Sequence, residues 1–411
     1  MFSFQVDKTD GRARAGVLAT DHGQVSTPVF MAVGTAGTVK GVTPGQLRAC
    51  GVQMVLGNTY HLLLRPGPDT VAALGGLHTM MAWDGPILTD SGGYQVFSLA
   101  HLRKIDDQCV TFRSHIDGSE VMLTPRRAIE VQQALGADII MQLDECAPGE
   151  AAREQVTEAV RRSALWAQLC KEAWLGGMAT REAGRHGDAA GGGSVCSQTR
   201  GASSAAKTGG QALFGIQQGG VHLDLRAESA ARLVELDLPG YAIGGLSVGE
   251  GHEPMVAVLE AIHEQFPADR PRYLMGVGEP RDILAAVLRG VDMFDCVLPT
   301  RNARNAQAFT WGGRMRLRNA RYANDRSPLD AACDCYTCAN FSRGTIRHLF
   351  MAGEMLGPTL MTIHNLHFFS QFMAAIRGAI VEGNLELRAR QWLAAMEAGN
   401  ESSKFEGRSS K

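Results

Sequence analysis

The sequence contains no long hydrophobic run. Nowhere in its 411 residues do about 18 apolar residues follow one another, as a membrane-spanning helix would require. Residues 1–14 also lack the charged, apolar and small-residue regions of a secretory signal. We therefore expect a cytoplasmic protein with no membrane partner.

An excess of charge of one sign is also absent. The formal net charge is −2 at pH 7, so the molecule as a whole would not attract a polyanion. Any nucleic-acid binding must come from a local cluster of basic residues. Hydrophobic residues make up 45% and charged residues 20% of the chain, which is typical of a globular protein with a large buried core.

The cysteines do not form the pattern of a disulfide framework. Their number, nine, is odd, and five of them are scattered along the chain, whereas disulfide-rich domains carry even sets at short spacings. The scattered five are Cys50, Cys109, Cys146, Cys170 and Cys196. Reduced thiols of this kind fit a reducing compartment.

A tight group of metal-ligand residues lies near the C-terminus. Three thiolates and one imidazole fill a tetrahedral shell around Zn²⁺ and leave no position for a water, so we predict one structural zinc ion per chain. The predicted ligands are Cys333, Cys335, Cys338 and His364. Spacing alone does not distinguish His364 from His348 and His367, which lie nearby.

Short apolar runs recur along the chain, and each is followed by a helix-compatible stretch. This alternation is typical of βα units. Eight such strands with crossover helices predict an α/β fold, a closed (β/α)8 TIM barrel, with a doubly wound sheet as the alternative. The predicted strands are residues 28–33, 53–58, 86–90, 138–144, 212–218, 241–246, 272–277 and 293–298.

Helix-start signals and turn residues divide the chain further. Pro44, Pro125 and Pro280 each follow a cap-type residue and precede a helical pattern. A hairpin with its turn at residues 21–23 precedes the first strand. We predict a barrel with this hairpin over residues 1–310 and 365–398, and a zinc-binding subdomain at 311–364. Residues 176–210, with ten glycines, and 399–411 are predicted to be a flexible insertion and a disordered tail.

Polar residues stand where the predicted strands end. Asn58, Asp90, Asp144 and Gln218 are at or near such ends, and Asp295 lies within the eighth strand. The carboxyl ends of barrel strands converge on one rim, so these residues are predicted to form one pocket and to favour the barrel over the doubly wound sheet.

The context of the carboxylates suggests a function. Asp90 precedes two glycines and Tyr94, which suits close approach of a planar ring, although a helix-capping turn is an equal alternative. Asp144 ends an apolar strand, where pairing with an arginine is the alternative. Asp295 lies in an apolar segment, where an idle carboxylate would be costly.

A strip of arginines follows Asp295. Seven arginines lie between residues 301 and 326, with Asp325 as the only acid. Such runs are usually solvated surface, but a basic patch on a nearly neutral protein is what contact with a phosphate backbone requires. The arginines are Arg301, Arg304, Arg314, Arg316, Arg318, Arg321 and Arg326.

These motifs, in this order, resemble those of the tRNA-guanine transglycosylases of bacteria, also called queuine tRNA-ribosyltransferases. The resemblance runs from about residue 5 to residue 397, interrupted only by the glycine-rich insertion. It rests on TDSGGYQVFS, QLDECAP, FGIQQGG, GGLSVGEG, YLMGVG, FDCVLPTRNARN and the cysteine-histidine set. Ala306 stands where the family usually has glycine, so the turn after the arginines is not fixed by the resemblance.

The resemblance implies roles for these residues. Asp295 would be the nucleophile that forms a covalent bond to the ribose of the wobble nucleotide of GUN-anticodon tRNAs, and Asp90 the general acid-base group. The incoming base would be 7-aminomethyl-7-deazaguanine (preQ1), because Cys146 and Val248 follow the bacterial pattern, and guanine would leave. The implied base-binding residues are Ser91, Gly92, Gly93, Tyr94, Asp144, Cys146, Gln218, Gly245, Leu246 and Met275.

The resemblance also implies partners. The tRNA anticodon loop would contact Gly276, Val277, Gly278, Glu279, Pro280, Arg281, Asp282, Thr300, Arg301, Asn302, Ala303 and Arg304. A homodimer near the zinc region would be the oligomeric state. The alternatives are a retaining glycoside hydrolase, which would have no need of the arginine strip, and a non-catalytic tRNA-binding subunit, which would be expected to lose Asp90 or Asp295. A metal-dependent barrel hydrolase would need histidine ligands on barrel strands, and no H-x-H occurs near the first strand.

Overall fold

The computed structural model describes residues 1–99, 103–149, 151–187, 210–246 and 249–405. Eight parallel strands close into a barrel, because the last strand pairs with the first, Met293 opposite Val29. This confirms the (β/α)8 barrel over the doubly wound sheet. The barrel strands are β4 (Val29–Gly34), β5 (Val55–Gly57), β6 (Ile87–Thr89), β10 (Ile139–Met141), β11 (Ala212–Gln217), β12 (Gly240–Ile243), β13 (Arg272–Leu274) and β14 (Met293–Asp295).

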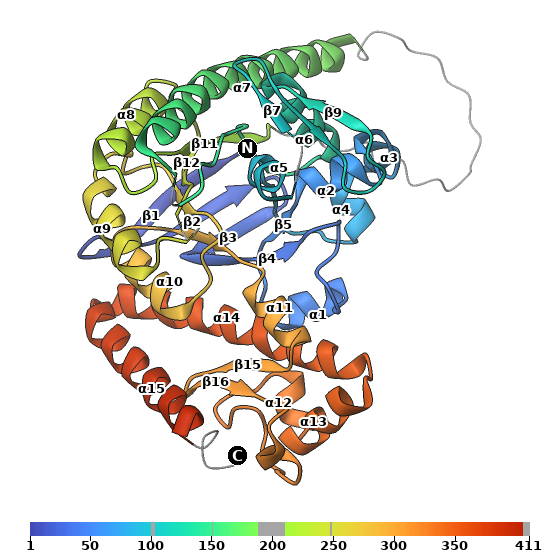
Figure 1. Ribbon diagram of the computed structural model, residues 1–411, viewed down its shortest axis with the longest axis vertical. Helices are drawn as coiled ribbons and strands as arrows, with labels where there is room; N and C mark the ends of the chain where they lie inside the picture. Colours follow the sequence, from blue (N-terminus) through green and yellow to red (C-terminus); the bar gives the residue numbers. More distant parts are fainter. Residues whose placement is uncertain (100–102, 150, 188–209, 247–248, 406–411) are drawn as a thin grey trace.

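Helices follow the strands and surround the barrel (Figure 1). All three proline-marked starts begin helices; at the first, Thr43 and Gln46 form a capping box that satisfies free backbone N–H groups. The helices are α1 (Pro44–Ala49), α2 (Thr59–Leu64), α3 (Pro68–Ala73), α4 (Gly76–Met81), α5 (Gly93–Leu99), α6 (Pro125–Leu135), α7 (Arg153–Gly187), α8 (Leu223–Val234), α9 (His252–Ile262), α10 (Pro280–Val287) and α11 (Leu298–Arg304).

A three-stranded antiparallel sheet of β1 (Ser3–Asp10), β2 (Ala13–Thr20) and β3 (Gly23–Thr27) precedes the barrel. Its β2–β3 hairpin was predicted, and β1 was not. Leu18 and Val25 of this hairpin join the same buried cluster as Met31 and Phe214 of the barrel interior. The sheet therefore covers the end of the barrel at which the strands begin.

A second antiparallel sheet, which the sequence did not indicate, lies between α5 and α6. It consists of β7 (Arg103–Ile105), β8 (Val110–Arg113) and β9 (Glu120–Leu123). Its strands are three or four residues long, too short to show an alternating pattern. Tyr60 of α2 donates or accepts a hydrogen bond with His115 of the β8–β9 connection (Oη–Nδ1 2.8 Å), which joins this sheet to the barrel.

The C-terminal subdomain lies to one side of the barrel, at the lower end of Figure 1. Helix α14 packs against both parts, since it contacts β1, β2 and β4 as well as α12, α13 and β15. The predicted boundary between residues 364 and 365 therefore falls inside one continuous helix. The elements are β15 (Gln307–Thr310), β16 (Gly313–Arg316), η1 (Ala320–Tyr322), α12 (Tyr336–Asn340), α13 (Arg343–Ala352), α14 (Leu356–Glu382) and α15 (Leu385–Phe405).

Two segments differ from the prediction of disorder. Helix α7 continues to Gly187, so residues 176–187 of the predicted flexible insertion are helical. Helix α15 reaches Phe405, beyond the predicted start of the tail at residue 399. In both segments helix-forming residues continue the preceding helix, and their propensity outweighs scattered glycines and serines. Residues 188–209 and 406–411 lie outside the described part of the chain. Within the described part, no helix is both long and apolar enough to span a bilayer.

Candidate active site

Three carboxylates gather at the rim where the barrel strands end. Asp90 follows β6, Asp144 follows β10 and Asp295 is the last residue of β14. Asp90 and Asp144 are buried, and Asp295 is partly exposed. The negative charges of Asp295 and Asp144 both act on Asp90, so the three groups belong to one site, as predicted from their positions at strand ends.

Asp90 is held at both oxygens by the chain that follows β5. Asn58 donates to Oδ2 (Nδ2–Oδ2 2.6 Å), and the backbone N–H of Thr59 donates to Oδ1 (2.8 Å). Burial nevertheless raises the pKa of Asp90 to about 7, with the neighbouring charges of Asp295 and Asp144 adding to the effect. A carboxyl with a pKa near neutral can both donate and accept a proton at physiological pH.

Asp295 receives its hydrogen bonds differently. The hydroxyl of Tyr273 (2.6 Å) and the backbone N–H of Gly276 (2.8 Å) both donate to Oδ1. Burial raises the pKa of Asp295, while these two bonds favour its ionised form. Burial and the adjacent Asp295 charge also raise the pKa of Tyr273 well above its usual value, so Tyr273 stays a neutral donor. Two donors on one oxygen fix the orientation of the carboxylate.

Asp144 links two further loops of the rim. Ser91 donates to Oδ1 (2.8 Å) and Gln218 donates to Oδ2 (2.7 Å). Ser91 in turn accepts from the backbone N–H of Gly93 (3.0 Å). Burial raises the pKa of Asp144 to about 6 despite these hydrogen bonds. The predicted alternative, an ion pair with an arginine, is not what the structure shows: both side-chain partners are neutral.

Two glycines of the site cannot be replaced without displacing these groups. A Cβ on Gly93 would lie 2.6 Å from the backbone oxygen of Asp144, and one on Gly245 would lie 2.4 Å from Oε1 of Gln218. Gly245 also has a φ of +65°, which favours glycine. The glycines therefore let the backbone lie directly against the hydrogen-bonding side chains.

The remaining predicted base-binding residues lie on the same loops. Tyr94, in the first turn of α5, is 50% exposed, so its ring is available to a ligand. Met275 follows β13 and packs partly on the barrel core. Leu246 and Cys146 are buried, and burial raises the pKa of Cys146 to about 12, so its thiol is neutral. The loop residue Val248 lies outside the described residues.

The predicted RNA-contacting residues form the start of α10 and the last turns of α11. Arg301 is exposed, whereas the side chains of Thr300 and Ala303 are buried. Asp282 is paired with His252 (Oδ1–Nδ1 2.5 Å) and Glu279 with Arg314. A cleft of about 680 Å³ opens beside them, lined by α10, the β15–β16 hairpin and the C-terminal helices, and it includes Arg281, Arg314, Arg316 and Arg321.

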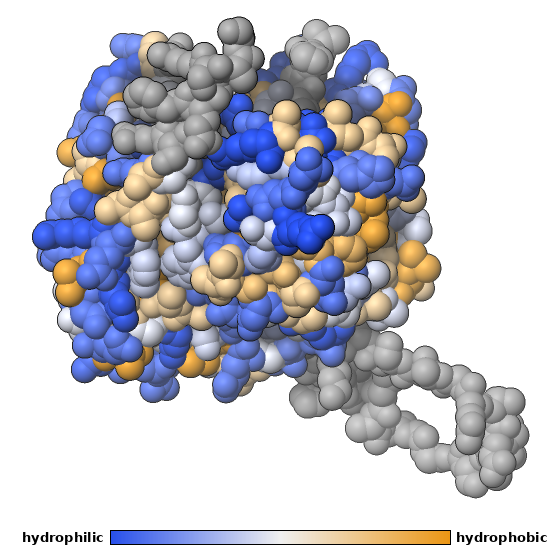
Figure 2. Space-filling view, turned by 90° about the horizontal axis from the view of Figure 1, so that it is seen from below, coloured by the Kyte–Doolittle hydropathy of each residue, from blue (hydrophilic) through white to orange (hydrophobic). Residues whose placement is uncertain are grey.

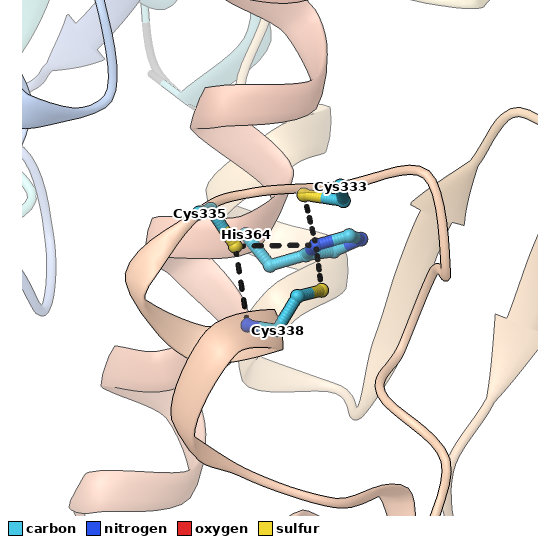
Figure 3. Close-up of side chains that lie close together, drawn as sticks. All are labelled: Cys333, Cys335, Cys338 and His364. Atoms are coloured by element: carbon cyan, nitrogen blue, oxygen red, sulfur yellow. Dashed lines mark hydrogen bonds between the residues drawn. The ribbon is translucent and has the colours of Figure 1, made fainter.

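The four predicted zinc ligands come together in the subdomain (Figure 3). The sulfurs of Cys333, Cys335 and Cys338 lie 3.6, 3.7 and 3.4 Å from Nδ1 of His364. Tetrahedral Zn²⁺ with ordinary Zn–S and Zn–N bonds would place them about 3.6 Å from that nitrogen. Nε2 of His364 bonds to the Phe309 carbonyl (2.8 Å), which leaves Nδ1 as the ligand atom.

The two competing histidines, His348 and His367, are not part of the four-residue cluster. His367 instead pairs through Nε2 with Asp334 (2.8 Å). The donor set therefore fits a closed structural site for zinc, with three thiolates and one imidazole and no open position.

Comparisons with known proteins agree with this geometry. A model of the family described as queuine tRNA-ribosyltransferase matches residues 8–398. The chain belongs to this family. Relatives named queuine tRNA-ribosyltransferase include those of Novosphingobium aromaticivorans (51% identical), Sphingopyxis alaskensis (52%) and Zymomonas mobilis (48%). The alignments cover 93%, 93% and 97% of this chain and 95%, 95% and 96% of the relatives, respectively.

Membership of the queuine tRNA-ribosyltransferase family assigns the chain to the pentosyl-transferring enzymes. This membership argues against the alternative in which the two carboxylates belong to a glycoside hydrolase. The metal-dependent barrel hydrolase does not fit either, because the zinc cluster lies beyond β14 and not on the barrel strands.

Sequence reasoning missed two residues that shape the site: Tyr273, which donates to Asp295, and Arg226. Arg226 of α8 is fully buried and donates to the carbonyl oxygens of Gly220 (2.9 Å), Gly244 (2.8 Å) and Gln217 (3.2 Å). It thereby joins the loops that carry Gln218 and Gly245. A signal was present: Ser229, Ala230 and Leu233 follow it at the three-, four- and seven-residue spacing of a buried helix face.

Proposed function

We propose that this chain is a tRNA-guanine transglycosylase that replaces guanine at the wobble position of GUN-anticodon tRNAs by preQ1, a step in queuosine biosynthesis. The observation that carries the proposal is the pair Asp90 and Asp295 at one rim. Asp90 has a pKa of about 7, and Asp295 is fixed by two donors on one oxygen. One group is suited to moving a proton and the other to attacking carbon.

The exchange takes place in two displacements. Oδ2 of Asp295 attacks C1′ of the ribose, the glycosidic bond breaks, and Asp90 gives its proton to the departing guanine. The incoming preQ1 then returns a proton to Asp90, and its ring nitrogen displaces Asp295 from C1′. Two inversions retain the configuration, as in retaining glycosidases. The base must leave the anticodon stack to enter the rim.

The hydrogen bonds of Asp144 support its role in recognising the base. Its carboxylate and the amide of Gln218 present a row of polar atoms, next to the backbone of Gly245 and Leu246. A purine-like edge with adjacent donors and an acceptor matches such a row, and Tyr94 and Met275 would flank the ring. Aromatic and thioether groups suit contact with a flat base.

The arginines beside the site provide the attraction that the net charge does not. Arg301 and Arg304 lie on α11, which directly follows Asp295. Arg281 and Arg316 line the cleft beside α10. We infer that these side chains contact phosphates of the anticodon loop, since such contacts fix a nucleic acid in position without reading its sequence.

Zinc has a structural role in this proposal. Cys333, Cys335, Cys338 and His364 would hold one ion and tie the loop before α12 to α14. The bound ion supplies folding free energy and no chemistry at the rim.

An exchange assay tests the function. The protein is incubated with radiolabelled guanine and an unmodified tRNA that carries a GUN anticodon, and label in the tRNA is counted. We expect incorporation, and release of that label when preQ1 is added. A tRNA differing only by cytosine at the wobble position is the control and should stay unlabelled. Equal labelling of both tRNAs, or of neither, would contradict the proposal.

We further propose a homodimer formed through the zinc-binding subdomain. Several large apolar side chains of α12–α14 are exposed there: Tyr336 (59%), Met351 (57%), Met355 (85%) and Leu356 (46%). Figure 2, which views the molecule from this side, shows small apolar groups among hydrophilic ones. Such a mixed surface is typical of interfaces that also exist exposed to water.

A further inference from the structure

A second cluster of metal-ligand side chains lies at the opposite end of the barrel from the carboxylate rim. His22 is in the turn between β2 and β3, His78 is on α4, and Asp138 immediately precedes β10. Asp144 follows the same strand at its other end. The cluster is therefore separate from the base-exchange site and from the Cys333–His364 site.

The carboxylate of Asp138 is the centre of this cluster. Its Oδ1 lies 2.7 Å from Nδ1 of His22, and its Oδ2 lies 3.2 Å from Nε2 of His78. Oδ2 also accepts the backbone N–H of Ile87 (2.9 Å). The Asp138 side chain is almost fully buried (4% exposed). Its position is therefore fixed by the barrel, and the two imidazoles converge on it.

The spacing of the three donors suits a divalent transition metal. One ligand atom from each residue lies within 4.8 Å of the others. In a tetrahedral zinc site, nitrogen and oxygen ligands at ordinary bond lengths are about 3.3 Å apart. The two measured distances, 2.7 Å to Oδ1 and 3.2 Å to Oδ2, are shorter than that value by about 0.6 and 0.1 Å. The histidine side chains would rotate to place both nitrogens on one ion.

The two histidine rings lie face to face. Their centroids are 3.6 Å apart and their planes differ by 17°. Imidazole nitrogens of histidine are common metal ligands. The side chains are reachable from solvent, because His22 is 31% and His78 is 14% exposed. The adjacent Asp21 is paired with the N-terminal ammonium group.

We propose that His22, His78 and Asp138 form a second metal site, which takes a divalent transition metal such as Zn²⁺ and completes its coordination with water. The three ligands come from the β2–β3 turn, from α4 and from the residue just before β10. A bound ion would therefore fasten the β2–β3 hairpin over the end of the barrel. Two nitrogens and one carboxylate suit zinc and its neighbours better than calcium or magnesium, which prefer oxygen.

Metal titration of the intact zinc-loaded protein tests the proposal. Protein with its cysteine site filled is incubated with excess Zn²⁺ and desalted, and metal per chain is measured by mass spectrometry. We expect two ions per wild-type chain, and a melting temperature that rises by about 2–4 °C with the second ion. His22→Ala should keep one ion and lose the shift, because His22 lies in an exposed turn and its removal leaves the barrel intact.

Two further variants separate metal binding from folding. Asp138→Asn should also lose the second ion, and the metal-dependent shift is compared within each variant so that differences in basal stability cancel. His263→Ala is the matched control: His263 lies beside Glu264 (3.2 Å) but belongs to neither ligand cluster of the described residues. It should keep both ions.

Cobalt shows where the second ion binds. Co²⁺ added to the zinc-loaded protein should give the weak visible absorption of nitrogen and oxygen ligands. A sulfur-to-metal band would place the added ion at the cysteines and overturn the proposal. The proposal would also be overturned if the wild-type chain bound only one ion in excess Zn²⁺. It would be overturned, too, if the metal-dependent shift of the melting temperature persisted in both His22→Ala and Asp138→Asn.

Discussion

Asp90 and Asp295 differ in the geometry of their hydrogen bonds, and this difference supports the roles proposed for them. Asp90 is held at both oxygens, whereas Asp295 is held at one. An oxygen that must form a bond to carbon needs to be free of strong donors, while a proton carrier needs only a suitable pKa and position. The geometry therefore agrees with attack by Asp295.

Trapping of the covalent intermediate distinguishes the two groups. Wild-type protein mixed with tRNA and a slowly reacting base analogue should give a complex that persists in denaturing gel electrophoresis. Asp295→Asn should give none, because an amide is a far weaker nucleophile, yet its tRNA affinity should stay within about tenfold and keep a steep salt dependence. Asp90→Asn should be slower by about 10²–10⁴-fold and still be trapped to some extent. The reverse pattern would exchange the two roles.

The raised pKa values predict how stability depends on pH. Asp90 and Asp144 have folded-state pKa values of about 7 and 6, above their ordinary value in the unfolded chain. The stability that their protonated forms contribute is present below about pH 4 and is lost as the pH rises through 6–7. We expect the melting temperature to fall between about pH 5 and pH 8.

Asp144→Asn is the variant that checks this expectation by calorimetry. The hydroxyl of Ser91 and the side-chain amide of Gln218 can each rotate to accept or donate a hydrogen bond. The substituted asparagine can therefore take the place of the protonated acid. The fall in melting temperature should be smaller in this variant than in the wild type. An unchanged pH dependence would show that Asp144 does not hold its proton in the folded protein.

The helices of the zinc-binding subdomain are expected to depend on the metal. Helix α12 is five residues long and α14 carries His364, so the cluster joins a short helix that could not persist alone to a long one. Cys335→Ser should lower the zinc content below one ion per chain and lower the melting temperature. Cys109→Ser is the control, because Cys109 is similarly buried but not in the cluster. Equal metal content and melting temperature in the two variants would contradict the assignment.

The turn after α11 contains a residue that departs from the family motif. Ala306, where the resemblance leads one to expect glycine, has a φ of +60° and is buried. The backbone thus keeps the left-handed conformation that glycine favours, at a strain of about 1–2 kcal/mol. Burial of the Ala306 methyl group offsets part of that strain, by about 0.8 kcal/mol.

Among the helices and strands, the sequence predicted those features that hydrophobic periodicity and the positions of strand ends reveal. The eight barrel strands are buried apolar runs bounded by polar residues, and the carboxylates at their ends converge as expected. Strand β1, with alternating exposure, and the short β7–β9 sheet carry weaker signals. The spacing after Arg226 indicates a buried helix face, but it does not show that Arg226 bonds to the loops of the site. The roles of Arg226 and Tyr273 depend on contacts with other segments of the chain.

The oligomeric state is a property of the whole molecule and is tested by light scattering after size-exclusion chromatography. We expect a dimer. Met355→Lys should shift it toward a monomer, because a charge would be buried in the interface. Met122→Lys changes a comparably exposed methionine on β9 (62%) and should leave the dimer intact. A wild-type monomer, or equal effects of the two substitutions, would contradict the proposed interface.

Helix α14 has a consequence for how the molecule melts. It packs on β1, β2 and β4 with one part of its length and on α12, α13 and β15 with another, and His364 lies within it. Neither the barrel nor the subdomain can lose this helix and keep its own buried surface. Heating should therefore give a single cooperative transition for both, with calorimetric and van't Hoff enthalpies in agreement, and a chelator that removes zinc should lower the melting of the barrel together with that of the subdomain.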